Sequence, residues 1–227
     1  MISPLGSRYG IQGALGRSVK RASTASTWWD LNGTITSCVA AYQPKGAASY
    51  AASLTDLSGN SKDATEGTSP DWDSTDGWKF NGTDDYLKTG VTPASGWSAV
   101  VRYSNYPLVS DTAFIFGGYG GAAAQMRLGR SSRKWYYANG EANNTDSTAR
   151  TSGICALAYN KVYFDGSELS GITTGTWSGT CQEIYLGCRN YNGAGFFSDV
   201  YIQAFAMYNA VLTSTQIGNL TTAMNAL

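Results

Sequence analysis

Apolar and polar residues alternate along most of the chain from residue 28 onward, in short segments separated by turn residues. In residues 98–105, Ala99, Val101 and Tyr103 occupy every second position, which places them on one face of a strand. Residues 112–118 are apolar on both faces, as expected for a central strand. Similar segments, often beside an Asn-Gly or Asp-Gly turn, recur at 78–90, 124–130, 134–142, 154–160, 161–169, 183–190 and 199–209.

Helical periodicity appears at the end of the chain. Thr213 and Gln216 have the spacing of a capping box, which begins a helix. An apolar stripe with spacings of three and four follows, formed by Ile217, Leu220, Met224 and Leu227. We therefore expect about nine strands with no helix between them, then one helix of about three turns packed on the sheets. This order is typical of an antiparallel β-sandwich and not of a parallel α/β sheet.

The composition agrees with a β domain and lacks the commonest catalytic group. Of 227 residues, 42% are apolar, and 27 glycines against 5 prolines fit a turn-rich β protein. The absence of histidine removes the commonest general base and the usual serine or cysteine triads. The glutamates do not form the close pair that a glycosidase needs; they are Glu66, Glu141, Glu168 and Glu183. We therefore expect that the protein is not an enzyme.

The cysteines form no CxxC pair, so neither a zinc ribbon nor a thioredoxin-like site is expected at Cys38, Cys155, Cys181 and Cys188. Buried free thiols are the favoured interpretation, and one or two disulfides remain the alternative. No run of 18 apolar residues is present, so we expect no membrane partner. The N-terminus has no continuous apolar segment of the kind that directs secretion.

The first 27 residues differ from the rest of the chain. They contain no acidic residue, and their charge of +4 comes from Arg8, Arg17, Lys20 and Arg21. Because the net charge of the whole chain is zero, residues 28–227 carry −4. Glycines interrupt the apolar residues of this segment, so it cannot form a core of its own. We expect a basic docking arm at 1–27, which orders on a partner or is a frayed terminus, and one domain at 28–227.

Four stretches resemble, in the same order, the LamG-like, concanavalin A-like jelly rolls. The early Asp-x-Ser-Gly-Asn segment of that family is similar to LTDLSGNSKDAT at 54–65. Its Phe-Asn-Gly-x-x-Asp-Tyr strand is similar to WKFNGTDDYLKTG at 78–90, and its Tyr-x-Asp-Gly hairpin to KVYFDGSEL at 161–169. Its closing strand, Tyr-Asn turn and helix are similar to AFAMYNAVLTSTQIGNL at 204–220. The resemblance covers about residues 36–225 and implies an all-β, antiparallel jelly-roll β-sandwich with a short C-terminal helix.

The resemblance leaves the function open, because this fold occurs in lectins, hydrolases, adhesion modules and virion proteins. The stretch CVAAYQPKGAASYAAS at 38–53 resembles structural proteins of tailed phages that carry this domain. We therefore expect a non-enzymatic virion protein: a capsid decoration, head-fibre or tail-associated protein. Its partners would be other virion proteins or copies of itself, and it would reach the outside of the cell by lysis. The alternative is a carbohydrate-binding module that grips glycans on the host surface.

Candidate sugar-stacking residues are the tryptophans in loop-like contexts, Trp72, Trp97 and Trp177. Each stands beside aspartate, glycine or serine, and an exposed ring next to polar groups is what sugar recognition requires. Trp78 and Trp135 instead fit the strand alternation, so we expect them in the core.

The acid-rich segment TSPDWDSTDGW is the one candidate for a cofactor. Asp71, Asp73 and Asp76 resemble a calcium loop, but Gly82 stands where an EF-hand needs glutamate. A looser calcium site formed with Asp84 or Asp85 is the remaining hypothesis, and a solvated turn between strands is the alternative. No other cofactor is expected.

A modest basic patch is expected from Arg127, Arg130, Arg133 and Lys134. Because the whole chain has no net charge, acidic neighbours in an assembly are favoured over nucleic acid as the partner of this patch.

Overall fold

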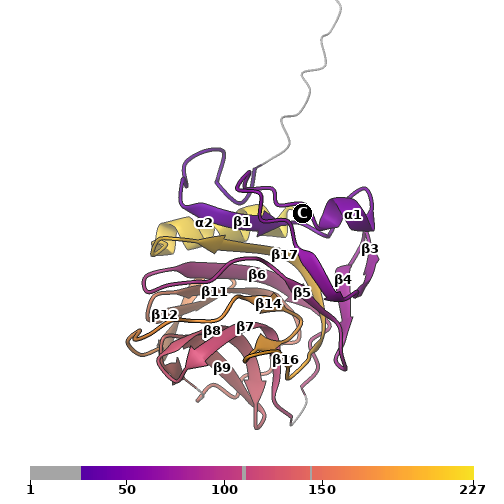
Figure 1. Ribbon diagram of the computed structural model, residues 1–227. Helices are drawn as coiled ribbons and strands as arrows, with labels where there is room; N and C mark the ends of the chain where they lie inside the picture. The colour runs from indigo at the N-terminus through magenta and orange to yellow at the C-terminus, as the bar shows by residue number, and fades with distance from the viewer. Residues whose placement is uncertain (1–26, 109–110, 144) are drawn as a thin grey trace, which may run out of the picture.

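Two β-sheets packed face to face form the body of the protein (Figure 1). The computed structural model describes residues 27–108, 111–143 and 145–227. The arm expected from Arg8, Arg17, Lys20 and Arg21 therefore lies outside the described residues.

The strand order of the first sheet is β13 (Ser167–Thr173), β12 (Lys161–Phe164), β11 (Gly153–Ala158), β6 (Ser98–Ser104), β17 (Asp199–Tyr208), β4 (Gly77–Asn81) and β3 (Asp71–Asp73), with β1 (Cys38–Tyr42) also paired to β17.

The second sheet begins at β10 (Ala142–Asn143) and continues through β9 (Lys134–Asn139), β8 (Ala124–Ser131), β7 (Ala113–Gly121), β14 (Tyr185–Leu186), β5 (Tyr86–Lys88) and β2 (Thr65–Thr68). A short hairpin of β15 (Arg189–Asn190) and β16 (Ala194–Gly195) joins β7 through β15. That bridge is parallel, and the other strand pairings are antiparallel. The antiparallel β-sandwich predicted from the alternation is confirmed.

The core between the sheets contains the residues that the alternation selects. Ala99, Val101 and Tyr103 of β6 face the second sheet, and Val100 points to the opposite side. Trp78 and Trp135 are fully buried in the same core, as predicted. Complete burial of a large apolar side chain contributes roughly 1.5–3 kcal/mol, so these aromatic residues account for much of the stability.

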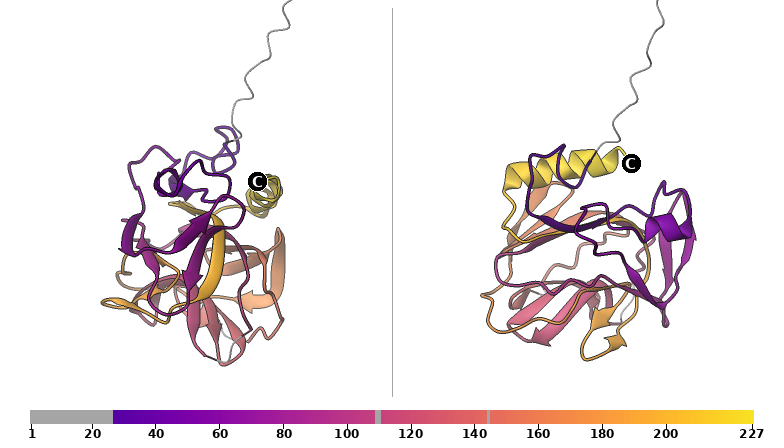
Figure 2. Two further views of the ribbon diagram at one scale, coloured as in Figure 1. Left: turned by 90° about the vertical axis from the view of Figure 1, so that its right-hand side faces the viewer. Right: turned by 45° about the horizontal axis from the view of Figure 1, so that its top comes forward.

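The C-terminal helix α2 (Ser214–Asn225) adds a third layer (Figures 1 and 2). The Thr213 side chain accepts a hydrogen bond from Gln216 N at 3.2 Å, and the Gln216 side chain accepts one from Thr213 N at 2.9 Å. This confirms the predicted capping box. The apolar stripe of α2 packs on the outer face of the first sheet, in a second cluster with Ile154, Ala156, Ala206 and Tyr208. The first sheet is thus covered on both faces, whereas neither α1 nor α2, the helices of the described residues, covers the outer face of the second sheet.

The loop after β1 is organised by one buried carboxylate. Asp56 is 7% exposed, and its two oxygens accept hydrogen bonds from the backbone N–H groups of Ala41, Ser58, Asn60 and Lys62 at 2.9–3.2 Å. The Ser58 hydroxyl donates a further bond at 2.9 Å. Because Ala41 belongs to β1, this carboxylate ties the loop to the first sheet. The Asp-x-Ser-Gly-Asn segment therefore has a structural role, because its aspartate holds the loop against the first sheet.

Some local features differ from the sequence-based expectations. The helix α1 (Tyr50–Ser53) lies between strands, so the expectation of no helix there is wrong; Ser49 caps this single turn. Part of the acid-rich segment forms strand β3 instead of a loop. The turn between β8 and β9 uses Ser132 and Arg133 at positive φ values of 53° and 65°. Asparagine and glycine favour this conformation, so neither residue signals the turn.

The four cysteines are free thiols, as favoured; Cys155, Cys181 and Cys188 are buried, whereas Cys38 is half-buried. Burial raises the pKa of Cys38 and Cys188 to about 12 and that of Cys181 to about 11. These thiols are therefore protonated near neutral pH. Among the described residues, no helix has both the length and the apolar content needed to cross a bilayer.

We expect Asp56→Asn to lower the free energy of unfolding by about 2 kcal/mol at neutral pH, because buried N–H groups lose a charged acceptor. Burial acts to raise the pKa of Asp56, but the bonds from Ala41, Ser58 and Lys62 outweigh it and lower the pKa. The stabilisation is therefore present above the unfolded value of about 4 and is lost as the pH falls through the folded value. Urea unfolding of wild type and variant at several pH values tests this.

The matched control is Asp199→Asn, which removes an exposed carboxylate and should change stability little. A difference between wild type and Asp56→Asn that stays constant from neutral to strongly acidic pH would contradict the role of the ionised carboxylate.

We expect Thr213→Ala to destabilise the protein by about 1 kcal/mol, because the first turn of α2 loses its capping acceptor. Thr215→Ala, in the same turn but outside the capping box, is the control. Thermal unfolding of both variants measures the difference. Equal midpoints would show that the cap adds nothing to the docked helix.

Candidate functional site

Two arginines lie together on the outer face of the second sheet. Met126 and Leu128 of β8 point into the core, so Arg127 between them points to the opposite face. Arg189 of β15 lies beside it, over the same part of β7. A Cβ atom placed on Gly117 would lie 2.8 Å from Arg127 Cβ and 3.5 Å from Arg189 Cγ. The missing side chain at Gly117 thus leaves the space that both arginines occupy.

Aromatic rings surround both guanidinium groups. Arg127 Cζ lies 4.5 Å from the ring centroids of Tyr119 and Tyr136. Arg189 Cζ lies 4.0 Å from the ring centroid of Phe196 and 5.2 Å from that of Tyr191. We call this surface the arginine–aromatic face; it consists of Arg127, Arg189, Phe114, Tyr119, Tyr136, Tyr191 and Phe196.

The two rings from the β15–β16 segment are open to solvent. Tyr191 is 55% exposed and Phe196 is 45% exposed, whereas Tyr119 and Tyr136 are half-buried. Phe114 lies underneath, 5.0 Å from Arg127 Cζ and 5.6 Å from Arg189 Cζ, measured to its ring centroid. The face therefore has a buried floor and exposed rings at its edge.

Hydrogen bonds hold Arg127 in a fixed position. Its Nη2 donates to the Tyr136 hydroxyl at 2.9 Å, and its Nε donates to the side-chain oxygen of Gln125. The Gln125 amide in turn donates to the Ala122 carbonyl at 2.5 Å. Arg189 differs, because its buried Nε has no hydrogen-bond partner among the described residues.

None of the ion pairs found in the described residues involves either arginine. The ion pairs in the described part of the chain involve the cations Lys79, Arg150 and Lys161. Burial lowers the pKa of Arg127 to about 10, and the like charge of Arg189 acts in the same direction. Burial also lowers the pKa of Arg189. Both groups remain cationic at neutral pH, so the face carries two positive charges outside these ion pairs.

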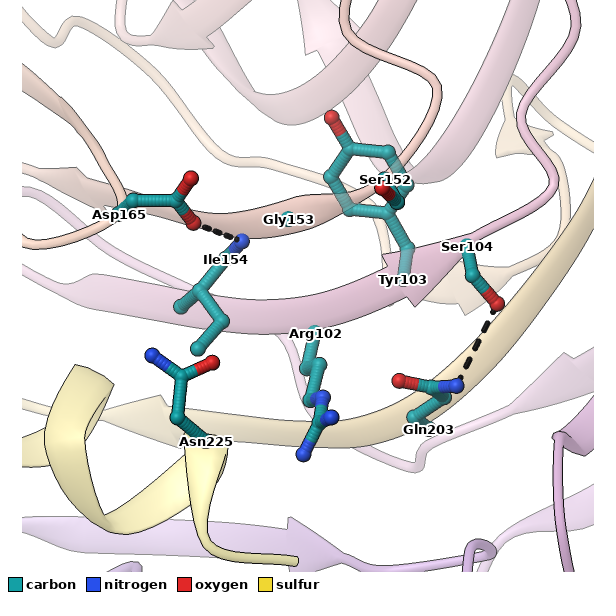
Figure 3. A pocket seen from close by; sticks show the side chains of 9 residues that line it. All are labelled: Arg102, Tyr103, Ser104, Ser152, Gly153, Ile154, Asp165, Gln203 and Asn225. Atoms are coloured by element: carbon teal, nitrogen blue, oxygen red, sulfur yellow. Dashed lines mark hydrogen bonds between the residues drawn. The ribbon is translucent and has the colours of Figure 1, made fainter.

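A second candidate is a pocket of about 520 Å³ on the outer side of the first sheet, beside the end of α2 (Figure 3). Arg102 points into it and donates to the carbonyls of Met224 and Leu227, while Tyr103 points to the other side of β6. Asp165 accepts a bond from Ile154 N at 2.9 Å. The charged groups of this pocket thus already have partners within the chain.

The three tryptophans predicted as sugar-stacking residues are only partly exposed. Trp72, Trp97 and Trp177 are half-buried, and each packs against the core between the sheets. Trp72 donates to the Pro44 carbonyl and Trp177 to the Gly179 carbonyl, both at 2.9 Å. No ring contact joins any two of the three in the described structure. Their role in sugar binding stays a prediction.

The acid-rich segment brings two of its three predicted calcium ligands together. Asp73 and Asp76 both pair with the ammonium group of Lys79, while Asp71 is exposed on β3. The Asp73 carboxylate also accepts bonds from the backbone of Thr75 and Asp76 at 2.8 Å. Within the described ranges, no group of three or more acidic or cysteine side chains converges on one point. Calcium binding here stays a prediction that would require Lys79 to leave the carboxylates.

The basic patch expected at residues 127–134 is divided between two faces. Arg127 belongs to the arginine–aromatic face, whereas Arg130 is buried and lies 5.5 Å from the ring centroid of the core residue Trp135. Arg133 and Lys134 are exposed. Sequence reasoning therefore found Arg127 but missed Arg189, Tyr191 and Phe196. The available signal was the glycine-rich run of β7, which marks a close approach of other groups.

No family model matches this chain, and no curated protein matches it. Solved structures with a similar fold include the sialidase of Trypanosoma rangeli in complex with sialic acid, with a TM-score of 0.60 and 20% identity. The match covers 83% of this chain and 33% of the sialidase, so the chain spans about a third of that protein.

Botulinum neurotoxin structures share the fold as well. One is the type C toxin, described as entering cells through interaction with two ganglioside molecules, with a TM-score of 0.63, 12% identity and coverage of 85% of this chain and 53% of that chain. Another is the binding domain of botulinum neurotoxin DC in complex with rat synaptotagmin II, with a TM-score of 0.59, 11% identity and coverage of 83% and 52%. At these identities the likeness shows the fold alone.

The expectation that the protein is not an enzyme is corrected by this comparison. Sialidases are enzymes, and they appear among the structures that share the fold. The lack of histidine and of paired glutamates removes particular mechanisms, whereas a β-sandwich frame occurs both in enzymes and in binding domains. The absence of these residue types therefore does not establish whether the protein is an enzyme.

We expect Lys79→Gln to bind calcium more tightly than wild type, because the ammonium group no longer competes for Asp73 and Asp76. Lys62→Gln, with the same change of net charge, is the control. The shift of the thermal midpoint on adding calcium measures the effect for each variant. No calcium-dependent shift in Lys79→Gln would eliminate this segment as a calcium site.

Proposed function

We propose that the chain is a carbohydrate-binding module that holds a glycan against the arginine–aromatic face. The observation that carries the proposal is the pair of exposed rings, Tyr191 and Phe196, beside guanidinium groups on the outer face of the second sheet. The apolar side of a sugar ring packs on aromatic side chains, and its hydroxyls need fixed hydrogen-bond donors. This surface supplies both kinds of group within one patch.

The comparisons support the same proposal. The names of the similar structures mention sialic acid in one case and gangliosides in another, which are sugar-containing ligands. Those ligands belong to the other proteins, and this chain spans only part of each. The shared β-sandwich fold is compatible with glycan binding on a sheet face or on its loops.

Attachment to a virion is a further part of the proposal. The basic residues of 1–27 would dock on other virion proteins or on copies of this chain, and the domain would present its glycan site outward. The charge difference between +4 at 1–27 and −4 at 28–227 supports such docking. The structure describes none of the four basic residues involved.

We expect Tyr191→Ala to weaken glycan binding by about tenfold, because an exposed stacking ring is lost while the core is unchanged. A glycan array would first identify ligands of the wild-type protein, and titration calorimetry would then compare the variants. Tyr159→Ala removes an exposed tyrosine from the β11–β12 turn and is the control. Unchanged affinity of Tyr191→Ala, or no glycan bound by the wild type, would overturn the proposal.

A further inference from the structure

The arginine–aromatic face holds more positive charge than a neutral sugar requires. Hydroxyl groups can be bound by uncharged amides and hydroxyls, without the cost of desolvating a cation. Two guanidinium groups next to each other and away from any carboxylate cost free energy, both through burial and through mutual repulsion. An arrangement of this kind gains most from a ligand that brings negative charge.

From this charge balance we infer that the ligand is an acidic glycan, one that carries a carboxylate or a sulfate group, and that Arg189 binds this group. The inference rests on the proposed function, since it names the class of glycan. A planar guanidinium presents paired N–H donors that match two oxygens of a carboxylate or sulfate. Tyr191 and Phe196 flank Arg189 on the exposed side, so the sugar ring packs beside its charged group.

Arg189 is the arginine available to the ligand. It is half-buried, its buried Nε has no hydrogen-bond partner, and none of the ion pairs in the described residues involves it. Arg127 is only 4% exposed and is held by Gln125 and Tyr136, so it acts as a fixed positive charge behind Arg189. A bound anion relieves the repulsion between the two, which adds to the gain from direct contact.

No carboxylate is among the groups that shift the pKa values of the two arginines. The neighbouring groups that act on the pKa values of Arg127 and Arg189 are tyrosines, the Cys181 thiol and, for Arg127, the charge of Arg189. The uncharged partners leave the positive potential of the face intact. A negatively charged group of the ligand would therefore lie beside the two positive guanidinium groups of Arg127 and Arg189, above the ring of Phe114.

Matched probes test the inference: lactose, sialyllactose and sulfated lactose, titrated into the full chain by calorimetry. We expect the wild-type protein to bind at least one acidic probe roughly tenfold to a hundredfold more tightly than lactose, as for a charge-assisted contact. Arg189→Gln should abolish this preference. Arg189→Lys should retain part of it, because the charge remains while the paired donors are lost.

Lys134→Gln is the control, because it removes an exposed cation from the same sheet with the same change of net charge. Thermal unfolding of each variant verifies that the fold is intact. A preference for sialyllactose assigns the carboxylate, and a preference for sulfated lactose assigns the sulfate. Inorganic sulfate is the third arm: binding as tight as that of the sulfated sugar would overturn the inference in favour of a simple anion site.

The remaining outcomes separate the two proposals. Equal affinity for neutral and acidic probes, lowered by Tyr191→Ala but not by Arg189→Gln, would overturn the acidic ligand and leave glycan binding intact. A preference for acidic probes that survives Arg189→Gln would overturn the assignment of the site. Failure of every neutral and acidic glycan to bind would remove the proposed function together with the inference.

Discussion

The packing of α2 on the first sheet decides which surface of the sandwich can receive a ligand. Ile217, Leu220 and Met224 exclude water from the outer face of that sheet, and the core between the sheets excludes it from the inner face. Both faces of the first sheet are therefore used for stability. Neither α1 nor α2 covers the outer face of the second sheet; the β15–β16 segment lies over part of it, with Phe114 and Arg127 buried beneath. The arginine–aromatic face lies there.

The stability that the layers provide also allows an arrangement that is unfavourable by itself. Two neighbouring cations on a sheet face would ordinarily be paired with carboxylates or exposed to water. Here Arg127 is kept in place by rings and two hydrogen bonds, and cation–π contacts of this kind contribute roughly 0.5–2 kcal/mol each. Such contacts offset part of the desolvation cost but do not remove the charge. Charged side chains that are partly buried beside a like charge are typical of ligand-binding sites.

The layers of the fold can be predicted from the sequence more readily than the candidate site can. Period-two alternation identifies the core face of β6, and the Thr213–Gln216 spacing identifies the start of α2, because both depend on neighbours in the chain. The turn at Ser132 and Arg133 and the short helix α1 are imposed by tertiary packing, which local preference does not report. The half-buried Trp72, Trp97 and Trp177 looked exposed because a loop context does not reveal what packs against it.

The candidate site escapes prediction for a similar reason. Arg127 could be placed on the outer face from its position between Met126 and Leu128. Arg189 reaches it only because β15 bridges to β7 through Asn190 and Gly118, residues distant in the chain. Contacts of this kind follow from the strand order and not from any local pattern. The sequence alone therefore does not place Arg127 and Arg189 side by side.

The β15–β16 hairpin pairs with β7 through that single bridge, and it supplies Arg189 and Tyr191 and leads directly into Phe196. Apart from the hairpin's own pairing and the Asn190–Gly118 bridge, the strand pairings of the two sheets involve residues outside this hairpin. Substitutions, insertions or deletions between residues 189 and 196 would present other side chains to the same floor of Phe114, Tyr119 and Tyr136. Evolution could therefore change the recognised ligand in this short stretch while the rest of the chain stays constant, and a library randomised in the same stretch could do so in the laboratory.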